Sequence, residues 1–212
     1  MKRVLRLGGH PFIKPLPMLK VNDPVGNDIH DIPAVCKRIQ EDWNNNSESL
    51  NRMTAFTLFR KLRKRLEMHE AGEHDGSVDL LITGCEVSLW VGEQFASDFH
   101  NAFPQLKVVT LSANKLLAQL GQGFPIPNTG FVFNEDSYNL NDSVVLLLSH
   151  SGGTFGTLNV SNLMKGYTSN LFVVTSEWDT QVARSVRARK RTGKPFVLQS
   201  FVFVTFCGCR PA

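Results

Sequence analysis

An uninterrupted apolar segment at residues 143–149, Ser-Val-Val-Leu-Leu-Leu-Ser, limits the fold more than any other feature of the sequence. A strand with one face in water alternates apolar and polar residues, whereas a parallel strand covered on both faces is apolar throughout. We therefore expect a parallel β-sheet with helices packed on both of its faces.

The segments around this strand alternate between short apolar runs and amphipathic helices. Further strands are expected at residues 78–83, 107–112, 170–175 and 196–206, and helices at 88–102, 114–121, 157–165 and 180–190. This alternation predicts an α/β three-layer αβα sandwich with a five-stranded parallel sheet in the doubly wound, flavodoxin-like order 2-1-3-4-5. Residues 122–140, interrupted by prolines and glycines, are expected to form a long connection beside the candidate site.

The first 76 residues carry helix signals and no strong strand. Pro33 is expected to open a helix that runs to Trp43, and Ser47 to cap a second helix with an apolar stripe from Leu50 to Leu66. A polar turn at 71–76 ends this part of the chain. The predicted domains are an N-terminal helical arm (1–76), an α/β domain (77–206) and a C-terminal tail (207–212) that is compatible with a longer protein.

The charge distribution argues against a nucleic-acid-binding protein, and the lengths of the apolar segments argue against a membrane-spanning one. The net charge of +4 comes largely from clusters of basic residues, but the cluster at 60–65 lies on the solvated face of an amphipathic helix. We therefore expect no nucleic-acid binding. No segment has the roughly 18–20 continuous apolar residues of a membrane span, and the N-terminus lacks the apolar core of a secretory signal. The expected location is the cytoplasm, with no readable membrane span.

The cysteines and histidines form no recognisable metal motif. All four cysteines are expected to be reduced thiols, and the single residue between Cys207 and Cys209 differs from the spacing of common zinc sites. His69 and His74 are five residues apart, so on a helix they would point to different faces rather than form a zinc-protease pair. We expect neither a metal nor a cofactor.

Two strand-to-helix junctions carry the residues that point to a ligand. Residues 148–157 read Leu-Ser-His-Ser-Gly-Gly-Thr-Phe-Gly-Thr, and residues 83–88 read Thr-Gly-Cys-Glu-Val-Ser. Glycines let the backbone approach a ligand, hydroxyls add donors, and the N-terminus of the following helix favours an anion. In the order 2-1-3-4-5 both junctions face the crevice between the first and third strands, where such sheets bind ligands. The sequence therefore predicts a phosphate monoester at this crevice.

With these motifs the chain resembles the sugar isomerase (SIS) family, whose members include the isomerase domain of glucosamine-6-phosphate synthase (glutamine–fructose-6-phosphate aminotransferase). Residues 149–154 are similar to the family's Ser-x-Ser-Gly-x-Thr phosphate loop, and residues 84–90 to its Gly-x-Gly-Thr-Ser-Tyr turn. A third similarity is the strand at 170–175 followed by residues 180–184, where the family has Ser-x-Leu-Ala before a helix. The resemblance covers residues 76–192.

The resemblance implies a phosphorylated sugar, a hexose or hexosamine phosphate, as the ligand and a homodimer as the assembly. The phosphate would be held by the residues that match the family's loops: Ser88, Ser149, His150, Ser151, Gly152 and Thr154. Thr175 and Thr180, from the third motif, are expected to form an additional part of the site. The sequence departs from the family at Glu86 and Val87, where members usually have Gly and Thr, and Glu86 places a carboxylate beside the anion site.

Aldose–ketose isomerisation, or a related step of amino-sugar metabolism, needs a general base and a general acid close to the substrate. Glu86 and His150 are the candidate catalytic residues. Two alternatives stay open: a regulatory domain that senses a sugar phosphate without turnover, and a serine hydrolase that uses Ser151. The hydrolase is disfavoured because residue 149 is Ser where the nucleophile-elbow motif G-x-S-x-G has Gly.

Overall fold

The computed structural model describes residues 24–120, 139–140, 142–187 and 201–204. The chain divides into two compact units, and the larger one, Ile39–Cys207, contains the sheet and every candidate site residue. The C-terminal tail and the connection at 122–138 lie outside the described residues. Among the described residues, no helix is both long and apolar enough to span a bilayer.

One parallel sheet forms the centre of the larger unit. Its order is β2-β1-β3-β4-β5, and the strands are β1 (Leu80–Gly84), β2 (Val108–Ser112), β3 (Val144–Leu148), β4 (Leu171–Thr175) and β5 (Phe201–Val204). Strand β3 lies between β1 and β4, with Leu148 opposite Gly84 on one side and Val174 on the other. The prediction of an α/β fold with a parallel sheet is confirmed.

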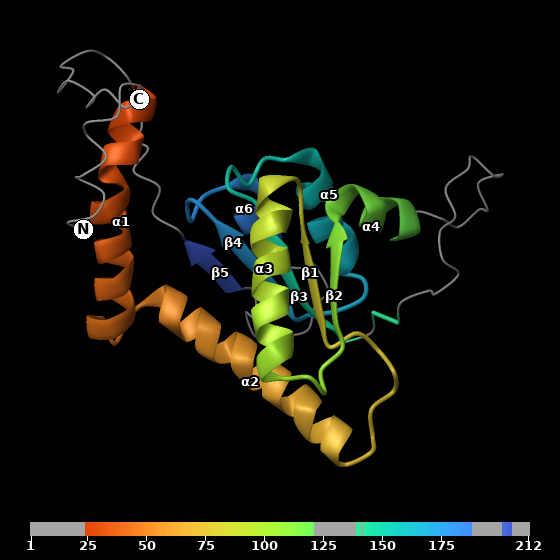
Figure 1. Cartoon of the computed structure of the whole chain (residues 1–212). Coiled ribbons are helices and arrows are strands. Elements are labelled where there is room, and N and C mark those ends of the chain that lie inside the picture. Colours follow the sequence, from red (N-terminus) through yellow and green to blue (C-terminus); the bar gives the residue numbers. More distant parts are fainter. Residues whose placement is uncertain (1–23, 121–138, 141, 188–200, 205–212) are drawn as a thin grey trace, which may run out of the picture. The chain divides into compact units, whose positions relative to one another are not determined.

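Helices cover both faces of this sheet (Figure 1). On one face lie α2 (Leu50–Glu70) and α3 (Val87–Ala102), and on the other lie α4 (Ala113–Leu120), α5 (Phe155–Met164) and α6 (Gln181–Arg187). Strand β3 contributes side chains to the cores on both faces of the sheet. Leu146 and Leu148 pack in the core under α2 and α3, and Val145 and Leu147 pack in the core under α4, α5 and α6. Burial on both faces is why its sequence is apolar without alternation.

Helix α2 packs on the sheet through Leu58 and Leu62, which share a core cluster with Phe99 of α3. Its N-cap is Ser49 rather than the expected Ser47, and the Ser49 hydroxyl accepts a hydrogen bond of 3.2 Å from the Arg52 N–H. Both serines can cap a helix, but Ser49 immediately precedes the first helical residue, which is the position that capping requires.

Helix α1 (Pro24–Asn45) begins nine residues before the expected start at Pro33. Pro33 lies inside the helix, where its missing N–H leaves one backbone hydrogen bond unmade. The expectation was wrong because a proline is favoured in the first turn of a helix but is also tolerated further along.

Candidate functional site

The two junctions predicted to bind a ligand lie side by side at the carboxyl edge of the sheet. β1 and β3 are neighbours, and a Cβ placed on Gly84 would lie 3.0 Å from the carbonyl oxygen of Leu148. Helix α3 follows β1, and α5 follows β3 (Figure 1). The chain therefore brings the N-termini of two helices to one crevice, as expected for a ligand site in a doubly wound sheet.

Residues 149–154, termed the phosphate loop below, have a defined hydrogen-bonded conformation. Ser149 is buried, and its hydroxyl accepts a hydrogen bond of 3.1 Å from the Gly152 N–H. Ser151 is exposed, and its hydroxyl accepts a longer hydrogen bond, 3.4 Å, from the Gly153 N–H. Gly152 has φ +60°, a conformation that favours glycine. Ser149 thus shapes the loop from inside, while Ser151 is available to a ligand.

Both helices at the crevice start without a side-chain cap. Thr154 is the N-cap of α5, but its hydroxyl makes no capping hydrogen bond, and neither does Glu86 at the start of α3. The first N–H groups of a helix lack intrahelical acceptors and carry the positive end of the helix dipole. Some of these N–H groups already have acceptors, because the Ser88 and Leu89 N–H groups donate to the carbonyl oxygens of Cys85 and Glu86, and the Thr157 N–H donates to the Cys85 thiol. The positive ends of the two helix dipoles still favour a bound anion at the crevice.

The predicted residues of the first junction occupy the other wall of the crevice. The Ser88 N–H donates to the carbonyl oxygen of Cys85 at 3.1 Å, and the Ser88 side chain is half-buried in the first turn of α3. Glu86 is exposed, with φ +49° and ψ −121°, a strained conformation for any residue but glycine. The family resemblance placed Gly at this position, which agrees with the backbone that the structure shows.

Cys85 is a site residue that the sequence interpretation did not single out. A Cβ placed on Gly156 would lie 3.3 Å from the Cys85 sulfur, so this thiol packs between the first junction and α5. Burial raises the pKa of the Cys85 thiol, a hydrogen bond from the Thr157 backbone opposes the shift, and the charge of Glu86 adds to it. The raised pKa keeps the thiol protonated at neutral pH, as suits a packing role.

The predicted additional residues, Thr175 and Thr180, lie against the phosphate loop. The Thr175 hydroxyl donates to the His150 carbonyl oxygen at 3.2 Å, and the hydroxyl oxygens of Thr175 and Thr180 are 3.1 Å apart. Ser176, which the sequence interpretation missed, donates to the same carbonyl through its N–H at 3.0 Å and its hydroxyl at 2.7 Å. Its only sequence signal is a hydroxyl directly after β4.

The two candidate catalytic residues lie on different walls of the crevice. Glu86 begins α3 and His150 belongs to the phosphate loop, and both side chains are exposed. Their carboxylate and imidazole groups are free of the hydrogen-bond networks among the described residues. Their role in proton transfer stays a prediction.

His69 and His74 do come together, contrary to the expectation that they point to different faces. Helix α2 ends at Glu70, the chain turns back, and the two rings stack with their centroids 3.6 Å apart. With Asp79 they form a cluster whose geometry resembles a metal site. The sequence argument failed because it assumed that the helix continues to His74.

The bonding around Asp79 nevertheless does not suit a cation. Its buried carboxylate accepts hydrogen bonds from His69 Nε2 at 2.8 Å, His74 Nε2 at 2.9 Å, Arg65 Nε at 2.8 Å and the Lys107 N–H at 2.7 Å. The buried guanidinium of Arg65 therefore already supplies a positive charge to this carboxylate.

The tautomer of His74 supports the same conclusion. The Gly76 N–H donates to His74 Nδ1 at 3.1 Å, so the ring hydrogen is on Nε2, the atom that faces Asp79. A metal ion bound to Nε2 would require the ring hydrogen to be on Nδ1. That hydrogen would then point at the Gly76 N–H, and two donors would face each other. The cluster is best described as a structural polar network, termed the Asp79 network below.

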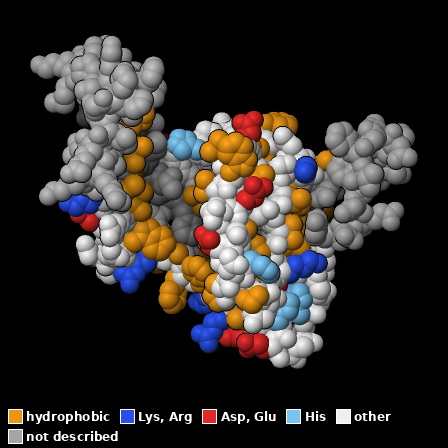
Figure 2. All heavy atoms as spheres, viewed as in Figure 1, with side chains coloured by type: hydrophobic (Ala, Val, Ile, Leu, Met, Phe, Trp, Pro, Cys, Tyr) orange, Lys and Arg blue, Asp and Glu red, His pale blue; other side chains and the backbone are white. Residues whose placement is uncertain are grey.

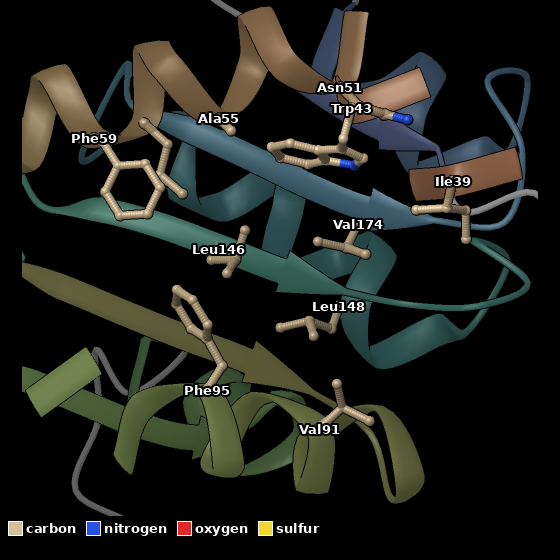
Figure 3. A pocket seen from close by; sticks show the side chains of 11 residues that line it. Ile39, Trp43, Asn51, Ala55, Phe59, Val91, Phe95, Leu146, Leu148 and Val174 are labelled. Atoms are coloured by element: carbon tan, nitrogen blue, oxygen red, sulfur yellow. The ribbon is translucent and has the colours of Figure 1, made fainter. Parts of the chain in front are cut away.

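Three cavities in the described part of the chain lie away from the crevice. One of about 830 Å³ is lined by apolar side chains such as Phe56 and Phe99 and by three arginines. A second, open cavity of about 290 Å³ is lined by residues of α1, α2, α3 and the sheet, and Figure 3 shows Phe59, Phe95, Leu146 and Val174 pointing into it. Its lining is almost entirely apolar, which does not suit a phosphorylated sugar. A small polar cavity of about 70 Å³, lined partly by Lys61, Lys64 and Asn170, lies at the amino edge of the sheet.

No protein-family model matches the sequence, and no curated protein sequence matches it significantly. Similarity is found instead among solved structures. The C-terminal domain of glucosamine-fructose-6-phosphate aminotransferase from Francisella tularensis aligns with a TM-score of 0.52 and 15% identity, over 87% of this chain and 40% of that one. Tagatose-6-phosphate ketose/aldose isomerase from Escherichia coli aligns with a TM-score of 0.51 and 14% identity, over 84% and 39%.

The chain thus spans about two fifths of the length of these two proteins. At this level of identity the similarity concerns the fold. The larger unit has the fold of the sugar isomerase (SIS) domain, and the resemblance inferred from the sequence motifs is confirmed at that level.

Proposed function

We propose that the chain binds a phosphorylated sugar, a hexose or hexosamine phosphate, with its phosphate group on the phosphate loop. The observation that carries this proposal is the convergence of two uncapped helix N-termini at the crevice between β1 and β3. The hydroxyls of Ser151 and Thr154 on one wall, and of Ser88 on the other, add donors for phosphate oxygens. Both solved relatives described above are named for sugar 6-phosphates.

Calorimetric titration tests this proposal directly. Fructose 6-phosphate and glucosamine 6-phosphate should bind, and fructose and glucosamine should not. Charge-assisted hydrogen bonds contribute roughly 1.5 to 3 kcal/mol each, so Ser151→Ala should weaken binding by about ten- to a hundredfold. Ser97→Ala is the matched control, because Ser97 is an exposed serine in the second half of α3 and lies away from the N-terminus of that helix. A folded protein that binds none of these ligands would refute the proposal.

Catalysis is a second step of the proposal. In it Glu86 moves the proton between C1 and C2 of the sugar, and His150 serves as the acid that protonates the sugar oxygen. Deuterium incorporation at C2 in deuterated water measures this proton transfer even when net conversion is slow. Glu86→Gln should abolish incorporation and keep phosphate-dependent binding. Binding without incorporation in the unmodified protein would instead support a sugar-phosphate-sensing regulatory domain.

The serine-hydrolase alternative receives no support from the geometry at Ser151. Among the described residues, the hydrogen-bond partner of the Ser151 hydroxyl is the Gly153 N–H, and no histidine bonds to it. A nucleophilic serine needs a base in hydrogen-bonding contact. A fluorophosphonate probe is expected to leave Ser151 unlabelled.

The assembly in this proposal is a homodimer formed through α2. Leu50, Met53 and Phe56 follow one another at three-residue spacing on α2, and their side chains are 55%, 57% and 76% exposed. Figure 2 shows hydrophobic side chains gathered on the viewed face of the molecule. Contiguous apolar surface of this kind is unusual on a monomer and marks an interaction site. Light scattering should give a dimer mass at tens of micromolar, and Phe56→Glu should give a monomer.

A further inference from the structure

The phosphate loop is tied to the junction between β4 and α6 through its backbone carbonyls. The His150 carbonyl oxygen accepts hydrogen bonds from the Thr175 hydroxyl, the Ser176 N–H and the Ser176 hydroxyl. The Gly152 carbonyl oxygen accepts a hydrogen bond of 2.8 Å from the Val182 N–H. The carbonyls on both sides of Ser151 are thus held by the same junction.

These bonds also orient the Ser151 N–H. The described chain contains no cis peptide bonds, and in a trans peptide the C=O and the following N–H point in opposite directions. The carbonyl of His150 points to the β4–α6 junction, so the Ser151 N–H points away from it. Because β4 and β1 lie on opposite sides of β3, this direction leads toward β1 and the crevice.

The Thr175 hydroxyl is the donor in both of its hydrogen bonds, to the His150 carbonyl oxygen at 3.2 Å and to the Thr180 hydroxyl oxygen at 3.1 Å. A hydroxyl has a single hydrogen, which these two acceptors share. The Thr180 side chain also fills the space in which a Cβ of Gly152 would lie. Thr180 therefore contacts the loop by direct packing on Gly152, and its hydroxyl accepts a hydrogen bond from Thr175.

We propose that Thr175 and Thr180 are positioning residues, which hold the phosphate loop with the Ser151 N–H turned toward the crevice and so determine its affinity for phosphate. They do this without contacting the ligand. The inference rests on the proposed function, because it takes the phosphate loop as the anion site. It assigns the affinity for phosphate partly to a third strand-to-helix junction, in addition to the two that form the crevice.

The test compares three threonine variants in titrations with fructose 6-phosphate and with inorganic phosphate. Thr175→Val keeps the shape of the side chain and removes the hydrogen bond to His150, so the affinity for both probes should fall by about tenfold. Thr180→Ala, which removes the packing on Gly152, should also weaken binding, whereas Thr180→Val, which keeps the shape of the side chain, should retain it. Thr168→Val is the matched control, because the Thr168 hydroxyl donates to the Ser143 carbonyl at the other end of β3.

Thr168→Val should lower stability as much as Thr175→Val and leave affinity within about twofold of the unmodified protein. The inference would be overturned if Thr175→Val loses as much stability as Thr168→Val and its affinity for phosphate is unchanged. Amide hydrogen exchange without ligand gives a second measurement, in which Thr175→Val should accelerate exchange at residues 150–154 and Thr168→Val should not. If the unmodified protein binds no phosphate, the proposed function fails. The exchange measurement needs no ligand, so unchanged exchange at residues 150–154 in Thr175→Val would refute the positioning role separately.

Discussion

Gly152 and Thr180 are in direct contact, and a Cβ placed on Gly152 would lie 2.3 Å from the Cβ of Thr180. Gly152 also has φ +60°, so both the available space and the backbone conformation require glycine at this position. The phosphate loop and the start of α6 are therefore fitted to each other without room for a larger side chain.

Gly152→Ala should consequently disrupt the loop. We expect the free energy of unfolding to fall by about 2 kcal/mol or more, because strain and overlap act together, and sugar-phosphate binding to be lost. Chemical denaturation and calorimetric titration measure the two effects. The double variant Gly152→Ala with Thr180→Gly removes the overlap and should recover part of the stability. No recovery would show that backbone strain alone accounts for the loss.

Glu86 is expected to be unfavourable for stability in its observed conformation. Glu86→Gly should raise the free energy of unfolding by about 1 kcal/mol, because glycine adopts φ +49° without strain. Glu86→Ala is the matched variant, since it removes the carboxylate and keeps the strained Cβ. If the carboxylate repels phosphate, both variants should bind fructose 6-phosphate more tightly, and only the glycine variant should be more stable. Weaker binding by both would show that Glu86 contacts the sugar.

The Asp79 network should make stability depend on pH in the acid range. Burial raises the pKa of Asp79, but hydrogen bonds from His69, the Lys107 N–H, Arg65 and His74 together outweigh burial and hold it below its usual value. A lowered carboxylate pKa contributes stability above the unfolded-state pKa, about 3.9, and that contribution is lost as the pH falls through the folded-state value.

Asp79→Asn should therefore lower the free energy of unfolding by about 3 kcal/mol at pH 7, because the amide NH₂ would face donor groups in the buried network. The difference from the unmodified protein should begin to shrink below about pH 4, where the unfolded chain takes up the proton, and should disappear as the pH falls through the lower pKa that Asp79 has in the folded protein. Denaturant titrations between pH 7 and pH 3 measure it. Asp98→Asn, at an exposed position on α3, is the control. A difference that stays constant with pH would contradict this account of the network.

The sheet could be predicted because each buried strand is recognisable from the apolar residues of its own short segment. The five residues of β3 are buried from both sides, and that condition is visible as a segment without alternation. The position of the loop at 149–154 between a buried strand and a helix could also be predicted, because a glycine pair and hydroxyls after an apolar run indicate such a junction. Binding of a phosphate by this loop stays a prediction. Ser151 and Thr154 are at the positions that this pattern implies.

The features that could not be predicted depend on contacts between distant parts of the chain. Ser176 acts through the carbonyl of His150, which is 26 residues away in sequence. His69 and His74 meet because the chain turns after Glu70 and both bond to Asp79. Neither relationship leaves a periodic or compositional signal. The start of α1 was missed for a different reason, because proline is compatible with a first turn and with a helix interior.

Thr83 offers a test of the core beneath the site. Its hydroxyl is buried and has no hydrogen-bond partner among the described residues. Thr83→Val keeps the shape of the side chain and removes the unsatisfied group, so the free energy of unfolding should rise by about 1 kcal/mol. Thr168→Val removes a hydroxyl that is hydrogen-bonded, and it should lower the free energy by a similar amount. A loss of stability in Thr83→Val would indicate an ordered water at this hydroxyl.

The location of the bound phosphate is the central claim, and amide chemical-shift mapping with fructose 6-phosphate tests it most directly. The account predicts saturable shifts at residues 151–154 and at Ser88, and no shifts in the presence of fructose. The small polar cavity lined by Lys61 and Lys64 is the competing anion site, at the other edge of the sheet. Shifts confined to residues around that cavity, or no shifts at all in the folded protein, would contradict the claim that the phosphate loop binds the phosphate.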